Sequence, residues 1–88
     1  MKIWTFTYAR RFENPITFIA KTKSEAERTF ILTVYHDLMS RDLADVAREL
    51  LDTLGHEGHE TALKRARDLH NDYTMEWSYA IQSHNLTI

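Results

Sequence analysis

The chain has 88 residues, of which 43% are hydrophobic, a net charge of −2 at pH 7 and no cysteine. This length fits one small domain over residues 1–88 with a thin core. The absence of cysteine excludes disulfides and thiol nucleophiles and fits a reducing compartment, so we expect a cytoplasmic protein. No apolar run approaches the roughly 20 residues that cross a bilayer, and the N-terminus lacks a signal-peptide core, so we expect no membrane contact.

The first third of the sequence predicts a β-hairpin. Aromatic residues alternate with threonines over residues 3–8, which is typical of a strand with one ring-bearing face. Residues 16–20 alternate in the same way, and the turn formers "ENP" precede them, with Pro15 outside the strand ladder. The two strands therefore flank a basic loop at residues 10–14.

The period then changes to that of a helix over residues 25–39. Two pairs have capping-box spacing at its start, Thr22 with Glu25 and Ser24 with Glu27, and either can begin the helix. The apolar residues that follow recur every three or four positions.

A second helix over residues 43–54 has the most regular apolar pattern in the chain. Ser40 or Asp42 can cap its start, and Gly55 is suited to end it. A third helical segment, residues 62–69, follows Gly58. The apolar face of the second helix is formed by Leu43, Val46, Ala47, Leu50, Leu51 and Leu54.

Residues 75–81 alternate again and predict a third strand. The element order is then ββαααβ, and strands at the two ends of the chain must pair to satisfy their backbone groups. We expect an α+β fold in which a small three-stranded sheet has the helices packed on one face. The pattern leaves open whether the third strand lies beside the first or the second.

The segment "LGHEGHET", residues 54–61, is the part of the sequence closest to a metal-site motif. His56 and His59 are three residues apart, one short of the spacing in His-Glu-x-x-His zinc helices, and the adjacent glycines favour a turn. We expect a solvated turn between helices, and a small metal-binding protein that uses His56 and His59 is one alternative. A third ligand would have to come from Glu60, His36, His70 or His84.

Catalytic patterns are missing from the rest of the sequence. It has no GxSxG elbow, no Walker loop and no GxGxxG, and its two glycines argue against close backbone contact with phosphates. We therefore expect no enzymatic activity and no cofactor.

Charge is unevenly distributed along the chain. Residues 1–30 hold six basic and three acidic side chains, whereas residues 37–60 hold two basic and seven acidic ones. On the second helix, acidic residues recur at spacings that gather them in one stripe opposite the leucines. Arg41 and Arg48 border the stripe and can pair with its members four residues on. The stripe is either a solvated face or a docking surface for a basic partner, and it consists of Asp42, Asp45, Glu49 and Asp52.

Affinity for a partner would have to come from exposed aromatic residues, and any of these that the core does not use could anchor an interface. The residues concerned are Trp4, Phe12, Tyr35 and Tyr73. A second alternative is a nucleic-acid-binding accessory protein in which Arg10 and Arg11 contact phosphates beside Phe12. The negative net charge argues against direct nucleic-acid binding, and a homodimer stays open.

A compact, cysteine-free chain that opens on the aromatic strand "MKIWTFTYARRF" and carries the acidic stripe resembles small accessory proteins of phages and mobile elements, such as anti-CRISPR proteins. The resemblance implies a stoichiometric inhibitor that covers a basic surface of a host nucleic-acid-binding complex. It also implies that a phage-encoded chain would act in the host cytoplasm. We expect a non-enzymatic protein-binding module with the acidic stripe as its partner-binding surface.

Overall fold

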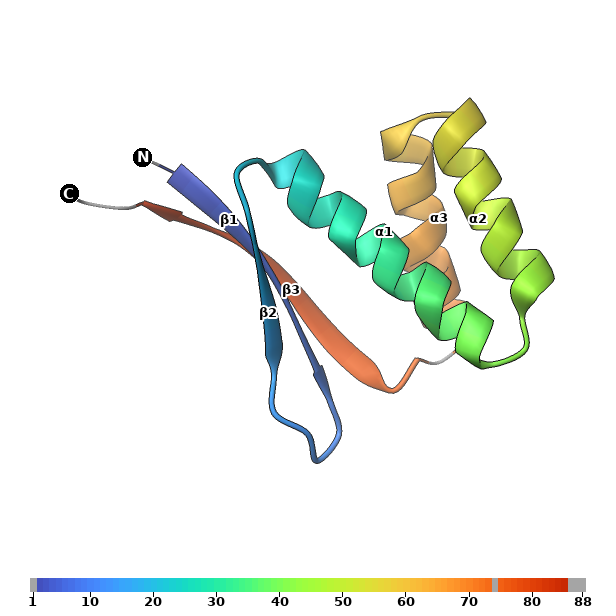
Figure 1. Cartoon of the computed structure of the whole chain (residues 1–88), viewed down its shortest axis with the longest axis horizontal. Helices are drawn as coiled ribbons and strands as arrows, with labels where there is room; N and C mark the ends of the chain where they lie inside the picture. The colour runs from blue at the N-terminus through green and yellow to red at the C-terminus, as the bar shows by residue number, and fades with distance from the viewer. Residues whose placement is uncertain (1, 74, 86–88) are drawn as a thin grey trace. The chain divides into compact units, whose positions relative to one another are not determined.

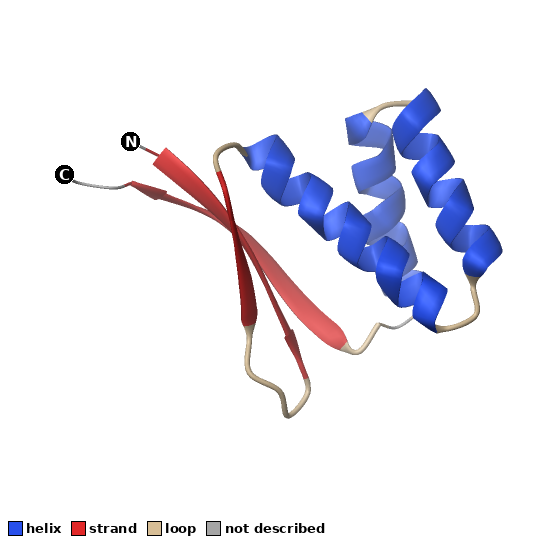
Figure 2. Cartoon of the chain, viewed as in Figure 1, coloured by secondary structure: helices blue, strands red, loops and turns tan. Residues whose placement is uncertain are grey.

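The computed structural model describes residues 2–73 and 75–85 and has the predicted α+β element order, ββαααβ (Figures 1 and 2). The chain divides into two compact units, a sheet unit of residues 2–29 and 75–85 and a helical unit of residues 30–73. The prediction that residues 1–88 form one domain with helices on one sheet face stays a prediction. The elements are β1 (Lys2–Arg10), β2 (Ile16–Ala20), α1 (Lys23–Ser40), α2 (Ala44–His56), α3 (His59–Asp72) and β3 (Trp77–Asn85).

The sheet unit is built around β1, which lies between the other two strands in the order β2-β1-β3. Both pairings are antiparallel, so the strand from the end of the chain lies beside the first strand. Phe6 marks the register, because it is opposite Phe18 on β2 and Ile81 on β3. The sequence left open whether the third strand lies beside the first or the second, and in the structure it lies beside the first.

The two faces of the sheet differ in composition, as the alternation in β1 predicts. One face carries aromatic rings, and Phe6, which is fully buried, stacks on Tyr8 and Phe18 at centroid distances of 5.8 and 6.3 Å. On the other face, side-chain hydrogen bonds cross the strands. The hydroxyls of Thr7 and Thr17 lie 3.0 Å apart, and so do the Thr5 hydroxyl and the His84 ring nitrogen Nε2.

The start of α1 uses the first of the two predicted capping pairs. The Thr22 carbonyl accepts the first helical hydrogen bond from the Ala26 amide, and the Thr22 hydroxyl accepts one from the Glu25 amide at 3.2 Å. In return, the Glu25 carboxylate accepts a hydrogen bond from the Lys21 amide at 3.1 Å. The Glu25 amide in the first turn and the Lys21 amide just before the helix thus both have an acceptor.

The core of the helical unit consists of one apolar stripe from each helix. The ring centroids of Phe30 on α1 and His70 on α3 lie 6.3 Å apart. Within the described ranges, none of the helices is long and apolar enough to span a membrane. The buried apolar residues of this unit are Phe30, Ile31, Val34, Leu38, Ala47, Leu50, Ala62, Leu63, Ala66 and Leu69.

The turn between α1 and α2 corrects the predicted cap of the second helix. Leu43 occupies the N-cap position and makes no side-chain cap hydrogen bond. The Ser40 hydroxyl instead donates to the Asp37 carbonyl within α1. Asp42 is left-handed, at φ 60°, and the amides of Asp42 and Leu43 donate to the carbonyls of Met39 and Leu38. This is the Schellman arrangement that ends a helix, so Asp42 closes α1 instead of capping α2.

The turn between α2 and α3 corrects the predicted end of α2. Gly55 lies inside the helix, which continues to His56, and Glu57 is the C-cap residue. Gly58 forms the turn, at φ 96° and ψ 174°, which is a region open almost only to glycine. The sequence contains two glycines in this segment, and only the second one has the backbone conformation that requires glycine.

These two glycines give opposite predictions for stability. A Cβ at either position would meet no atom within 4 Å, so only the backbone distinguishes them. Gly58→Ala should destabilise the fold by about 1–3 kcal/mol because of its dihedral angles. Gly55→Ala should stabilise it by about 0.5–1 kcal/mol, because alanine favours the helix. Urea unfolding followed by circular dichroism measures both, and equal effects of the two substitutions would contradict the assigned turn.

The capping pair at α1 gives a second prediction. Thr22→Ala removes the acceptor of the Glu25 amide and should lower the free energy of unfolding by about 1 kcal/mol. Ser24→Ala, at the rejected capping position, is the matched control and should change it by less than about 0.5 kcal/mol. The same urea titrations measure both variants. A larger loss of unfolding free energy in Ser24→Ala than in Thr22→Ala would show that Ser24, and not Thr22, caps the helix.

Candidate functional site

The acidic stripe is exposed along its whole length. Asp45, Glu49 and Asp52 lie on α2, where the buried residues Ala47 and Leu50 belong to another face of the helix. Asp42 precedes them in the α1–α2 turn. The structure therefore places three of the four predicted residues on one helix and the fourth on the turn that leads into it.

Few ion pairs within the chain neutralise the stripe. Arg48 approaches Asp45 at 4.0 Å and Arg65 approaches Glu49 at 3.9 Å, both at the outer limit for an ion pair and both solvated. Such surface pairs contribute little and compete weakly with a partner. Among the described residues, neither Asp42 nor Asp52 makes a side-chain ion pair.

The predicted pairing of Arg41 with Asp45 is wrong, and so is that of Arg48 with Asp52. The left-handed Asp42 interrupts the helix between Arg41 and Asp45, so the two are not four residues apart on one helix. Arg41 instead contacts Asp37 on α1 at 3.2 Å and donates to the Tyr73 carbonyl at 3.1 Å. It thus links the end of α1 to the end of α3, and it does not neutralise the stripe.

The hairpin loop carries the second set of predicted residues. Arg10 and Arg11 are exposed, and Phe12 is 94% exposed with a left-handed backbone at φ 67°. The Arg11 guanidinium lies 5.0 Å from the centroid of the Phe12 ring. A bulky residue held at positive φ is uncommon, and such backbone conformations cluster at binding sites, so this loop tip is a candidate contact point.

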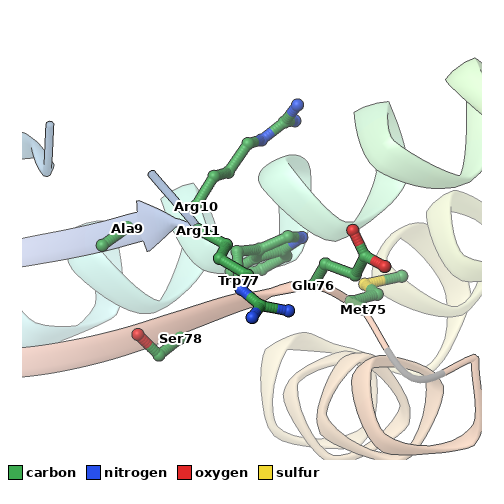
Figure 3. A pocket seen from close by; sticks show the side chains of 7 residues that line it. All are labelled: Ala9, Arg10, Arg11, Met75, Glu76, Trp77 and Ser78. Carbon is green, nitrogen blue, oxygen red and sulfur yellow. The ribbon is translucent and has the colours of Figure 1, made fainter. Parts of the chain in front are cut away.

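An open hollow of about 460 Å³ lies beside this loop (Figure 3). Figure 3 shows that the Arg10 and Arg11 side chains diverge, so they do not converge on one anion. The Glu76 carboxylate adds a charge that would repel phosphate, and no histidine accompanies Ser78 as a base among the lining residues. The hollow therefore has neither a phosphate clamp nor a nucleophile with its base. It is lined by Ala9, Arg10, Arg11, Met75, Glu76, Trp77 and Ser78.

The two histidines of the predicted metal alternative lie on different helices. His56 is the last residue of α2 and His59 the first of α3, with the Gly58 turn between them. In the described part of the chain, no group of three closely spaced potential ligands includes His56. The geometry thus gives no support to chelation by this pair.

Of the predicted aromatic anchors, only Phe12 is largely exposed. Trp4 is half-buried, and the ammonium groups of Lys2 and Lys23 lie 5.2 and 5.9 Å from its ring centroid. Tyr35 and Tyr73 are also half-buried.

Three apolar residues on β2 are exposed without having been predicted as a surface feature, namely Ile16, Phe18 and Ile19. Their alternation fits any strand, and only the strand order reveals that this one is an edge.

Comparison with known proteins found no matching family model, no match among curated proteins and no match among solved structures.

Proposed function

We propose that this chain is a non-enzymatic protein-binding module that docks onto a basic surface of a larger partner through the acidic stripe. The observation that carries the proposal is the exposure of all four carboxylates, two of which lack ion-pair partners among the described residues. A rigid helix presents three of them, so little conformational entropy is lost on binding. Charges of this kind act mainly through steering and orientation of the partner.

The chemistry of the stripe favours a partner that itself binds nucleic acid. Such proteins expose basic surfaces that contact phosphates, and a row of carboxylates can occupy them. The resemblance in size and layout to anti-CRISPR proteins supports the same class of partner. A stoichiometric inhibitor of a host nucleic-acid-binding complex is thus the proposed role.

A second candidate function, nucleic-acid binding, is favoured by the hairpin loop. Phe12 offers a ring on which a base can stack, and Arg10 and Arg11 are exposed beside it. The diverging guanidinium groups suit two separate phosphates of a flexible strand better than one small anion (Figure 3).

Charge reversal tests the protein-binding role. Asp45→Lys, Glu49→Lys and Asp52→Lys together should weaken binding of the partner at least about tenfold, a loss of about 1.4 kcal/mol. Asp42 is left unchanged because its backbone closes α1. The partner is first captured from the native host and identified by mass spectrometry, and its affinity is then measured with purified components.

The matched control reverses three exposed acids elsewhere, Asp68, Asp72 and Glu76. Each triple variant changes the net charge from −2 to +4, since three reversals add six charges. Only the stripe variant should lose affinity, and urea unfolding should show both variants folded. Equal losses of affinity in the two variants would mean that only the net charge matters. Unchanged affinity of the stripe variant would show that α2 is not part of the interface.

Nucleic-acid binding is tested by fluorescence anisotropy with labelled single strands of DNA and RNA at several salt concentrations. Arg10→Ala with Arg11→Ala should reduce the steepness of the plot of log K against log salt concentration by about 1.4, since each phosphate contact to a single strand contributes about 0.7. Lys64→Ala with Arg67→Ala, two exposed residues of α3, is the control and should leave it unchanged. No binding of the unmodified chain at low salt would exclude this function.

A further inference from the structure

One backbone edge of β2 has no strand partner among the described residues, because β2 is the outer strand in the order β2-β1-β3. A strand edge with free amides and carbonyls is a template for pairing with another chain. Proteins commonly protect such edges with charges, prolines or bulges. In β2 the sequence is "ITFIA", without charge or proline, and its register with β1 runs unbroken over five pairs.

The other outer strand, β3, is a poorer template. Its exposed side chains are mainly polar, including Ser78, Gln82 and His84. On β2, by contrast, Ile16 is 45%, Phe18 44% and Ile19 74% exposed. Covering β2 would therefore remove apolar surface from water, which favours association.

The aromatic face of the sheet also ends abruptly at β2. The ring centroids of Trp77 on β3 and Tyr8 on β1 lie 5.7 Å apart. Tyr8 in turn stacks on Phe18, with centroids 6.3 Å apart and ring planes 12° from parallel. This row of rings crosses all three strands, and its outermost ring, Phe18, is open on the side away from β1. A further aromatic ring beside Phe18 would continue the row.

We propose that two copies of this chain pair through β2, antiparallel about a two-fold axis at Phe18, to form a continuous six-stranded sheet. The inference goes beyond the docking role of α2 and does not depend on it. In this register Phe18 faces Phe18 of the second copy, Ile16 faces Ala20, and Thr17 faces Ile19. Each exposed apolar side chain of β2 thereby gains a neighbour: Phe18 meets a second aromatic ring, and Ile16 and Ile19 face the smaller Ala20 and Thr17.

The alternation of side chains selects this register. Opposed residues of an antiparallel pair share a face, so Phe18 and Ile16 can oppose only other members of the aromatic face. A shift by one residue would bring aromatic and threonine faces together. A shift by two would leave two of the five residues of β2 opposite loop residues, whereas the register centred on Phe18 pairs all five.

Charge complementarity favours a second copy as the occupant. Glu13 precedes β2, whereas Lys21 and Lys23 follow it. In the antiparallel register Glu13 of one copy comes opposite Lys23 of the other, within a hairpin loop that is otherwise basic, whereas parallel pairing would place lysines beside lysines. The same short segment thus supplies matching apolar residues and opposite charges on both sides, as an isologous interface requires.

Sedimentation equilibrium over about 1 µM to 1 mM, a range that resolves micromolar dissociation constants, tests the proposal. The chain of 10.4 kDa should approach twice that mass, 20.8 kDa, as its concentration rises. Ile19→Lys puts a charge on the proposed interface and should weaken the dimer at least about tenfold. Ala80→Lys puts the same charge on the same face of β3, at the other edge, and should leave the dimer intact.

Disulfide cross-linking tests the register independently of these lysine variants. The chain has no cysteine, so Phe18→Cys introduces a single thiol at the proposed axis. Directly opposed residues have Cβ atoms about 4.5–5.5 Å apart, so mild oxidation should link the two copies rapidly. In Ile16→Cys the two thiols are offset by four residues, about 13 Å along the strand, and should cross-link slowly.

A monomeric wild-type chain at every concentration overturns the proposal and leaves the β2 edge to an extended peptide of another protein. A dimer that tolerates Ile19→Lys, or that cross-links faster at residue 16 than at residue 18, also overturns it. The triple charge reversal on α2 should leave the dimer unchanged. The docking proposal and the dimer proposal can therefore be disproved independently of each other.

Discussion

The antiparallel pairing of β1 with both other strands is the constraint from which the arrangement of the sheet follows. β1 joins β3 across almost the whole chain, as in the pairing of Phe6 with Ile81, and joins β2 through a short hairpin. Since both of its edges are used, β2 and β3 must be the outer strands. Because β3 pairs with the opposite edge of β1, the outer edge of β2 stays without a strand partner among the described residues when the sheet is complete.

The turn between α1 and α2 determines which charges are free. Asp42 takes the left-handed position that glycine or asparagine usually occupies at a helix end. This break directs Arg41 towards Asp37 and the Tyr73 carbonyl, where it ties two helix ends together. As a result, a cation that could have neutralised the start of the stripe is used in the fold, and the carboxylates of α2 stay available to a partner.

The two candidate surfaces differ in their physical character and lie in different units. The stripe on α2 is charged, solvated and suited to rapid, salt-dependent contact with a basic surface. The edge of β2 is uncharged and apolar, and it offers backbone hydrogen bonds in addition to side chains. A protein can use surfaces of these two kinds at once, one for self-association and the other for a partner.

The sequence by itself determined the elements, because each depends on local patterns: two-residue alternation in the strands, the leucine period in α2 and capping-box spacing before α1, where the structure selects Thr22 with Glu25 from the two candidate pairs. It also determined that the stripe faces solvent, since the carboxylates lie opposite the leucines. The sequence did not predict the left-handed backbone of Asp42, nor that Gly58 and not Gly55 forms the turn after α2. Both features depend on how consecutive helices meet. Only the tertiary structure decided the strand order, which depends on pairing between distant segments and makes β2 an exposed edge.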